Sequence, residues 1–184
     1  MHKRRWEHHQ LDNSVWDACI NGTPWEETEF IQRCLTCIDI AGGSFGYTNR
    51  ERFLTERIPY LQWIYRNMKL HGYMMQEECP KDHRNRGVMH EVAVNIGRSG
   101  EIIFNNSSGN HRLSFAKILS ISEIPLLVIV RHERWQALRK EIYSARSVSE
   151  LSAEARCHLE HPDMRDVAEK LLYRDAAAEE YQRV

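Results

Sequence analysis

The segment from Ser107 to Arg112, which reads Ser-Ser-Gly-Asn-His-Arg, concentrates groups that bind anions. An apolar run precedes it and residues with helical periodicity follow it, so we expect a strand-to-helix junction with the helix beginning at His111 or Arg112. The first N–H groups of a helix have no intrahelical acceptor and carry partial positive charge. Such a junction binds phosphate through backbone donors, and the sequence therefore predicts a phosphate site here.

The side chains of this junction fit the same chemistry. Gly109 permits positive φ and a close approach of the backbone, and Arg112 adds a charged, bidentate donor. His111 can orient a phosphate or exchange a proton. In the structural alternative, Ser108 or Asn110 only caps the helix and Arg112 is a surface cation. The predicted phosphate- or nucleotide-binding residues of this segment are Ser107, Ser108, Gly109, Asn110, His111 and Arg112.

A second polar group, Arg131-His132-Glu133, follows the next apolar run. The carboxyl end of a strand is where loops gather around ligands in many α/β arrangements. Arg131 and His132 are predicted to complete the phosphate site, and Glu133 to act as a base or metal ligand. Glu91 and Glu101 are further candidates for the base. The alternative is a surface turn with a local ion pair.

The first third of the chain predicts helices. One is expected from about residue 24 to 40, where Thr23, Pro24 and Glu26 form an N-terminal signal. A capping box at Thr48 opens the next, which Gly72 ends and Pro59 kinks or splits.

The middle third predicts strands. Residues 91–96 and 101–104 alternate around a Gly-containing turn and indicate a hairpin. The apolar run from Ile124 to Val130 has strand length, and we expect it to be covered on both faces. The class is therefore α+β with a small mixed sheet. Further helices are predicted at 112–120, after Trp135 to about Tyr143, at 151–159 and from 162 to about 181.

The net charge of −1 offers no overall attraction for nucleic acid or an anionic membrane, so an anion site must be local. The longest apolar run is far shorter than the roughly 20 residues that span a bilayer. The N-terminal segment has basic residues but no apolar stretch after them, so no secretory signal is expected. These features predict a cytoplasmic protein that does not enter a membrane.

Five cysteines with no export signal favour reduced thiols. Cys34 and Cys37 have CxxC spacing inside a helical pattern, which permits a redox pair or half of a zinc site completed by Cys157 and His161. Isolated cysteines are commonly plain buried residues, and no second CxxC is present. We therefore predict no metal site.

From about Tyr60 to His132 the chain resembles the ParB/sulfiredoxin superfamily. The helix ending at His71-Gly72, the hairpin, the segment Gly109-Asn110-His111-Arg112 and the following helix match the order of elements and the phosphate box of that superfamily. The resemblance implies a small mixed sheet of ParB/sulfiredoxin type. Within one domain spanning 1–184, it implies an N-terminal helical extension at 1–59, a core at 60–132 and C-terminal helices at 133–184.

The resemblance also bears on function. Asn110 occupies the position of the reacting cysteine in sulfiredoxins, so sulfiredoxin activity is not expected. Partition ParB proteins have Gly-Glu-Arg-Arg where this chain has Gly-Asn-His-Arg. We predict a protein that binds a nucleotide, ATP or CTP with Mg²⁺, or another phosphorylated small molecule. Its enzymatic form would be a nucleotide-dependent phosphotransferase, with His111 and Glu133 as catalytic residues.

Two other functions stay open from the sequence. One is a nucleic-acid-binding or nuclease-like ParB-type module, in which the basic loop at 81–86 and Arg98 grip the backbone. The same loop is a candidate lid or clamp over a phosphate site. The other is a noncatalytic partner-binding protein in which the box serves only as a helix cap.

Overall fold

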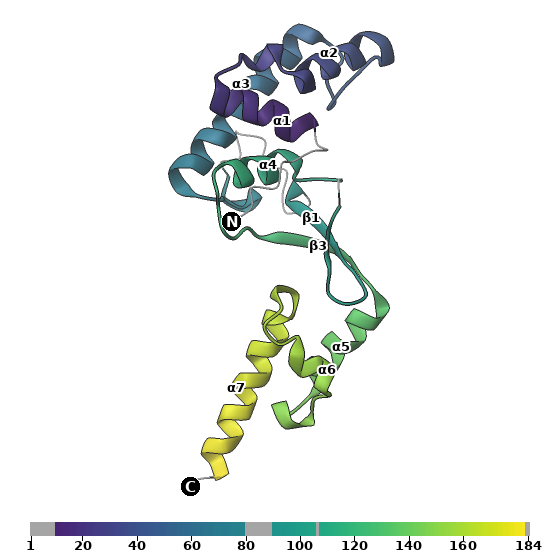
Figure 1. Cartoon of the computed structure of the whole chain (residues 1–184), viewed down its shortest axis with the longest axis vertical. Helices are drawn as coiled ribbons and strands as arrows, with labels where there is room; N and C mark the ends of the chain where they lie inside the picture. The colour runs from purple at the N-terminus through teal and green to yellow at the C-terminus, as the bar shows by residue number, and fades with distance from the viewer. Residues whose placement is uncertain (1–9, 80–89, 106, 183–184) are drawn as a thin grey trace. The chain divides into compact units, whose positions relative to one another are not determined.

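Helices make up most of the chain, and residues between 92 and 131 supply the strands of a small sheet (Figure 1). The structure is a computed structural model that describes residues 10–79, 90–105 and 107–182. These described residues contain seven α-helices and three strands. The predicted α+β class is confirmed.

The sheet has the strand order β2-β1-β3. The predicted hairpin forms its first two strands, and Val94 lies opposite Phe104 in their antiparallel register. The N–H of His132 donates to the carbonyl of Ile96 over 2.9 Å, so the carboxyl ends of β1 and β3 coincide and these strands run parallel. The sheet is therefore mixed. The strands are β1 (Val92–Ile96), β2 (Ile102–Phe104) and β3 (Leu126–Arg131).

The chain divides into two compact units. Unit 1 contains residues 1–93 and 106–127, and unit 2 contains residues 94–105 and 128–184. The chain passes from one unit to the other within β1 and within β3. The subdivision at residues 59 and 132 that the sequence suggested stays a prediction.

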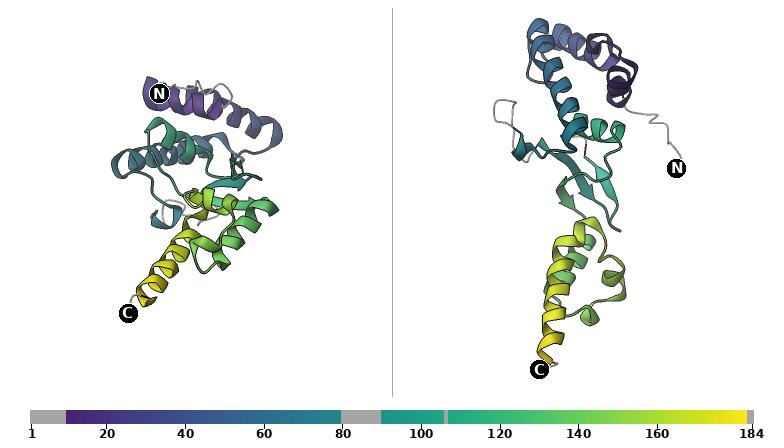
Figure 2. Two further views of the ribbon diagram at one scale, coloured as in Figure 1. Left: turned by 60° about the horizontal axis from the view of Figure 1, so that its bottom comes forward. Right: turned by 90° about the vertical axis from the view of Figure 1, so that its left-hand side faces the viewer.

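Unit 1 has a helical core in which Val15, Ile31, Phe53, Leu61 and Phe115 are fully buried. Its first helix packs against its last (Figure 2). Apolar residues that recur on one face of each helix supply this core. The helices are α1 (Gln10–Trp16), α2 (Glu29–Ala41), α3 (Arg50–His71) and α4 (Asn110–Ile118), and a short π-helix (Asp17–Asn21) and a 3-10 turn (Trp25–Glu27) connect α1 to α2.

Two predicted helices differ in detail from those observed. The helix expected at 24–40 is interrupted at Thr28, whose extended backbone separates the 3-10 turn from α2 and whose hydroxyl donates to the carbonyl of Trp25. The N-cap of α3 is Asn49, which accepts from the N–H of Arg52, so Thr48 is not the cap. Helix α3 runs unbroken through Pro59, and Gly72 ends it as predicted.

The prediction that both faces of the last strand are covered is wrong. Ile129 and Val130 of β3 are 43% and 56% exposed. Among the described strands, β3 lies at an edge of the sheet and has one strand neighbour. An apolar run predicts a strand here but does not show whether other elements cover it.

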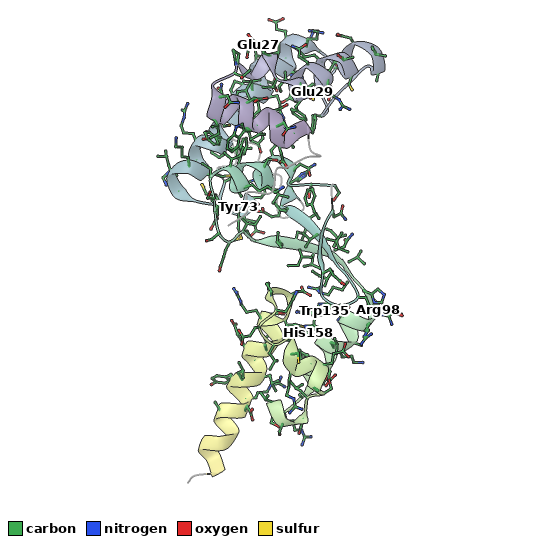
Figure 3. The ribbon with its side chains drawn as sticks, viewed as in Figure 1. Glu27, Glu29, Tyr73, Arg98, Trp135 and His158 are labelled. Carbon is green, nitrogen blue, oxygen red and sulfur yellow. The ribbon has the colours of Figure 1, made fainter. Side chains whose placement is uncertain are left out.

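Unit 2 surrounds the fully buried Trp135, whose indole N–H donates to Asp163 over 2.9 Å. The ring of His158 packs edge-on against Trp135, and both residues are labelled in Figure 3. The ring of His161 packs edge-on against Trp135 as well. A Cβ on Gly100 would lie 2.6 Å from the Trp135 ring, so only glycine fits there. The helices of unit 2 are α5 (Glu133–Ser144), α6 (Ala153–Cys157) and α7 (Arg165–Gln182), with 3-10 turns at Val148–Glu150 and Pro162–Met164.

Asp163 joins this core to β3. It accepts from the guanidinium of Arg131 through both carboxylate oxygens, at 2.7 to 3.2 Å, and from Trp135. Burial opposes ionisation, but the hydrogen bonds from Arg131 and Trp135 outweigh it and hold the pKa of Asp163 below its ordinary value.

Asp163→Ala should lower the free energy of unfolding by about 2–4 kcal/mol, because the buried indole N–H of Trp135 loses its acceptor. The matched control is Asp166→Ala, which removes a largely exposed partner of Arg139 and should cost about 1 kcal/mol or less. Urea unfolding followed by tryptophan fluorescence measures both. Equal losses in the two variants would contradict the role given to Asp163.

Candidate functional site

The predicted strand-to-helix junction exists, and α4 begins at Asn110 with Gly109 as its N-cap. The N–H of Leu113 makes the first bond of the helix, to the carbonyl of Gly109 over 2.9 Å. The N–H groups of Asn110, His111 and Arg112 therefore precede the hydrogen-bond ladder. The helix starts one residue before the expected position at His111.

The predicted conformation of Gly109 is confirmed. Its φ is +76°, and a Cβ there would meet the Cα of Val92 and lie 2.6 Å from its nitrogen. The backbone thus lies against the start of β1, and no larger residue fits. The hydroxyl of Ser108 donates to the carbonyl of Glu91 over 2.7 Å, so this predicted ligand also ties the junction to β1.

A cavity of about 230 Å³ lies at the N-terminus of α4 within unit 1. The predicted junction forms one wall, and one face of α3 forms another. No carboxylate is among the described residues that line it. The lining consists of Phe45, Arg57, Tyr60, Ile64, Gln76, His90, Ser107, Ser108, Gly109, Asn110, His111 and Arg112.

His111 is 9% exposed, and its Nδ1 lies 3.4 Å from a terminal nitrogen of Arg57. A guanidinium only donates, so Nδ1 accepts and the proton of the neutral ring lies on Nε2. That Nε2 is buried and has no hydrogen-bond partner among the described residues. Burial, and then the charge of Arg57, hold the pKa of His111 well below its ordinary value. The His111 ring is therefore neutral, and its Nε2–H is a donor without an acceptor among the described residues.

Two arginines supply positive charge to the cavity. The Arg57 guanidinium lies over the rings of Phe45 and Tyr60, at 4.9 and 5.5 Å. Cation–π contacts of this kind hold a guanidinium in place without neutralising its charge. Arg57 thus joins the residues of the junction as a donor that α3 provides.

Arg112 is held differently from what the sequence suggested. It is 4% exposed, so it is not a surface cation. One terminal nitrogen donates to the carbonyl of Met74 and the other to the sulfur of Cys79, the latter over 3.0 Å. Its guanidinium also lies over the ring of Tyr73. The bidentate fork expected for phosphate therefore has internal acceptors, and Arg112 contributes mainly its charge.

The candidate bases have other partners. Glu91 is buried and accepts from the hydroxyl of Tyr73 and the N–H of Gln76. Glu101 accepts from the N–H of Ser99 over 2.9 Å. Neither carboxylate lines the cavity, so neither is placed to act as its base.

The second predicted group, Arg131, His132 and Glu133, belongs to unit 2. Arg131 pairs with Asp163, and the His132 ring accepts from the N–H of Arg134 as the N-cap of α5. Glu133 lies in the first turn of α5. None of the three lines the cavity of unit 1.

Sequence reasoning missed the contribution of Phe45, Arg57 and Tyr60. A signal for Arg57 was available, because it falls at helical spacing between the buried residues Phe53 and Leu61 of α3. An arginine inside an apolar stripe is seldom buried without a specific partner. The position of Phe45 had no comparable signal.

Three further candidates from the sequence are the CxxC pair, a zinc site and the basic loop. Cys34 is buried and Cys37 exposed, and both are free thiols. In the part of the chain that the structure describes, no group of three or more His, Cys, Asp or Glu residues is placed to hold a metal ion. The basic loop at 81–86 lies outside the described residues.

Comparisons with protein-family models, with curated proteins and with solved structures found no match. No described helix combines the length and apolar character needed to cross a membrane. The chemistry of the cavity is therefore the basis for assigning a function.

The stability of unit 1 should depend on pH through His111. The pKa is lower in the folded protein than the ordinary value of 6.5, so the unfolded chain takes up a proton first as the pH falls below that value. The free energy of unfolding should then decline by up to about 1.4 kcal/mol per pH unit. His111→Phe should remove this part of the slope, whereas the exposed His71→Gln should keep it. Urea titrations from about pH 7.5 to about pH 5.5 test this, and equal slopes in all three proteins would refute it.

The fit of Gly109 against β1 gives a second expectation. Gly109→Ala should lower the free energy of unfolding by at least about 2 kcal/mol more than Gly42→Ala. Both glycines have φ near +80°, at +76° and +80°, but a Cβ on Gly42 would meet nothing within 4 Å. The comparison separates steric conflict from backbone strain, and similar losses would show that the close approach is unimportant.

Proposed function

We propose that the cavity of unit 1 binds a phosphorylated ligand, and that this ligand is a nucleotide such as ATP or CTP. The observation that carries the proposal is the lining of this cavity, which brings His111, Arg57 and the N-terminus of α4 together without a described carboxylate. The buried Nε2–H of His111 is a donor that lacks an acceptor among the described residues. An unpaired buried donor costs about 1–3 kcal/mol, which a bound oxygen acceptor would recover.

The surroundings of His111 favour an anion over a neutral acceptor. The backbone N–H groups at the start of α4 add donors and partial positive charge. Arg57 and Arg112 add two full charges to the lining, and no described lining residue is acidic. Arg57 and Arg112 are themselves buried, and charges at buried positions act more strongly than on a surface.

The size of the cavity limits what it encloses. At about 230 Å³ it is smaller than the roughly 300–1,000 Å³ typical of pockets that enclose a whole drug-sized ligand. A phosphoryl group with part of a sugar fits this volume. The remainder of a nucleotide would extend to the rim.

The proposal is binding, and it does not include turnover. A phosphotransferase needs a base near the acceptor hydroxyl, and the described lining of the cavity contains no carboxylate. The resemblance of residues 60–132 to the ParB/sulfiredoxin superfamily agrees with nucleotide binding. The catalytic roles of His111 and Glu133 and the use of Mg²⁺ stay predictions.

ATP, CTP or pyrophosphate should raise the melting temperature of the protein. At 100 times the dissociation constant, a ligand adds about 2.7 kcal/mol to the free energy of unfolding, which a thermal scan resolves. Arg57→Met keeps the apolar stem and removes the charge, so it should weaken pyrophosphate at least about tenfold. Titration calorimetry with and without Mg²⁺ gives the constants.

The matched control is Arg52→Met. Arg52 lies on the same helix but is exposed and paired with Glu56, so its loss should leave the ligand constants unchanged. If no phosphorylated compound raises the melting temperature of the parent protein, the proposal fails. A steep loss of affinity for DNA with rising salt, without nucleotide binding, would instead favour the nucleic-acid alternative.

A further inference from the structure

A tight turn at Ser44–Tyr47 brings an aromatic ring to the cavity. Ser44 and Tyr47 exchange two backbone hydrogen bonds of 2.9 Å, and Phe45 and Gly46 form the two-residue tip. Both tip residues have positive φ, at +51° and +79°. A two-residue tip with this pattern is a hairpin turn of the primed type.

Phe45 is an unusual residue for this conformation. The first tip position of such a turn favours Asn, Asp or Gly, because other side chains crowd the backbone at positive φ. Backbone strain of this kind persists where the surroundings hold it, and it is frequent at ligand sites. The turn therefore places an aromatic ring where the backbone alone disfavours one.

The Phe45 ring lies next to Arg57 and His111 of the proposed site. It lies 4.9 Å from the guanidinium of Arg57 and 6.1 Å from the centre of the His111 ring. Phe30 packs edge-on against it at 5.7 Å. With these neighbours in place, 51% of Phe45 is still exposed, so part of the side chain is free for contact.

We infer that Phe45 makes this site selective for nucleotides over simple phosphates by stacking on the base. The inference rests on the proposed function, since the phosphate must occupy the start of α4. The volume of the cavity fits a phosphoryl group and part of a sugar, which would leave the base outside it, next to the half-exposed lining residue Phe45. Aromatic side chains bind bases through their faces with little preference among the bases.

This role differs from that of a shield for Arg57 and His111. A shield acts on the phosphate site itself, so its loss would weaken pyrophosphate and nucleotides by the same factor. A stacking ring acts on the base alone. The ratio of the nucleotide constant to the pyrophosphate constant therefore separates the two roles.

The test uses the full chain with Phe45→Leu and Phe45→Trp. Leu keeps apolar bulk and the same backbone strain but has no ring, whereas Trp enlarges the ring. Calorimetry with ATP, CTP, ribose 5-phosphate and pyrophosphate should show nucleotide binding at least about tenfold weaker in Phe45→Leu, with a change of about threefold or less for the two ligands without a base. Phe45→Trp should bind ATP and CTP at least as tightly as the parent.

Each other outcome has a definite meaning. If Phe45→Leu weakens all four ligands equally, or leaves ATP and CTP unchanged, the stacking role is overturned. If the parent binds pyrophosphate as tightly as the nucleotides, the selectivity is overturned while the phosphate site stands. If the parent binds none of them, the proposed function itself fails.

Discussion

The close approach of the Gly109 backbone to the start of β1 is the constraint on which the candidate site depends. It fixes where α4 begins relative to the start of β1. The hydrogen bond from Ser108 to the carbonyl of Glu91 stabilises the same junction. The first residues of α4 line the cavity because the chain turns at this point. A side chain at position 109 would move the helix start away from β1 and disperse the donors.

Electrostatic balance in the cavity follows from how each cation is held. Arg112 is buried against backbone and thiol acceptors, and Arg57 against aromatic rings. Burial, and then the charge of Arg57, disfavour protonation of the imidazole of His111, which is why this ring stays neutral. The cavity thus combines the positive charges of two arginines with the N–H donor of a neutral imidazole.

The local features of the fold were accessible from the sequence. Gly72 and Gly109 were expected because a helix end and a strand-to-helix corner require positive φ. The hairpin followed from alternation around a glycine-containing turn. Thr48 and Asn49 both suit an N-cap, and only the position of the first helical turn decides between them.

Long-range partners were not accessible. Arg112 finds its acceptors at Met74 and Cys79, more than 30 positions earlier in the chain, and Arg131 finds Asp163 at a similar separation. Composition and spacing describe neighbours along an element, whereas these pairs depend on how elements pack. For the same reason, the sequence placed Arg131 at the phosphate site and gave no indication of Phe45.

Helix α1 contacts α4 and so supports the site, although it lies far from the cavity residues of α4 in the sequence. Asp12 accepts from Ser114 of α4 and lies 3.4 Å from the ammonium of Lys117. The first turn of α1 therefore binds α4, and the N-terminus of α4 forms the site. A protease that cut between α1 and α2 would weaken these contacts of Asp12 with α4 and would leave every cavity residue intact. Loss of ligand after such a cut would then report a loosened helix and not a missing contact.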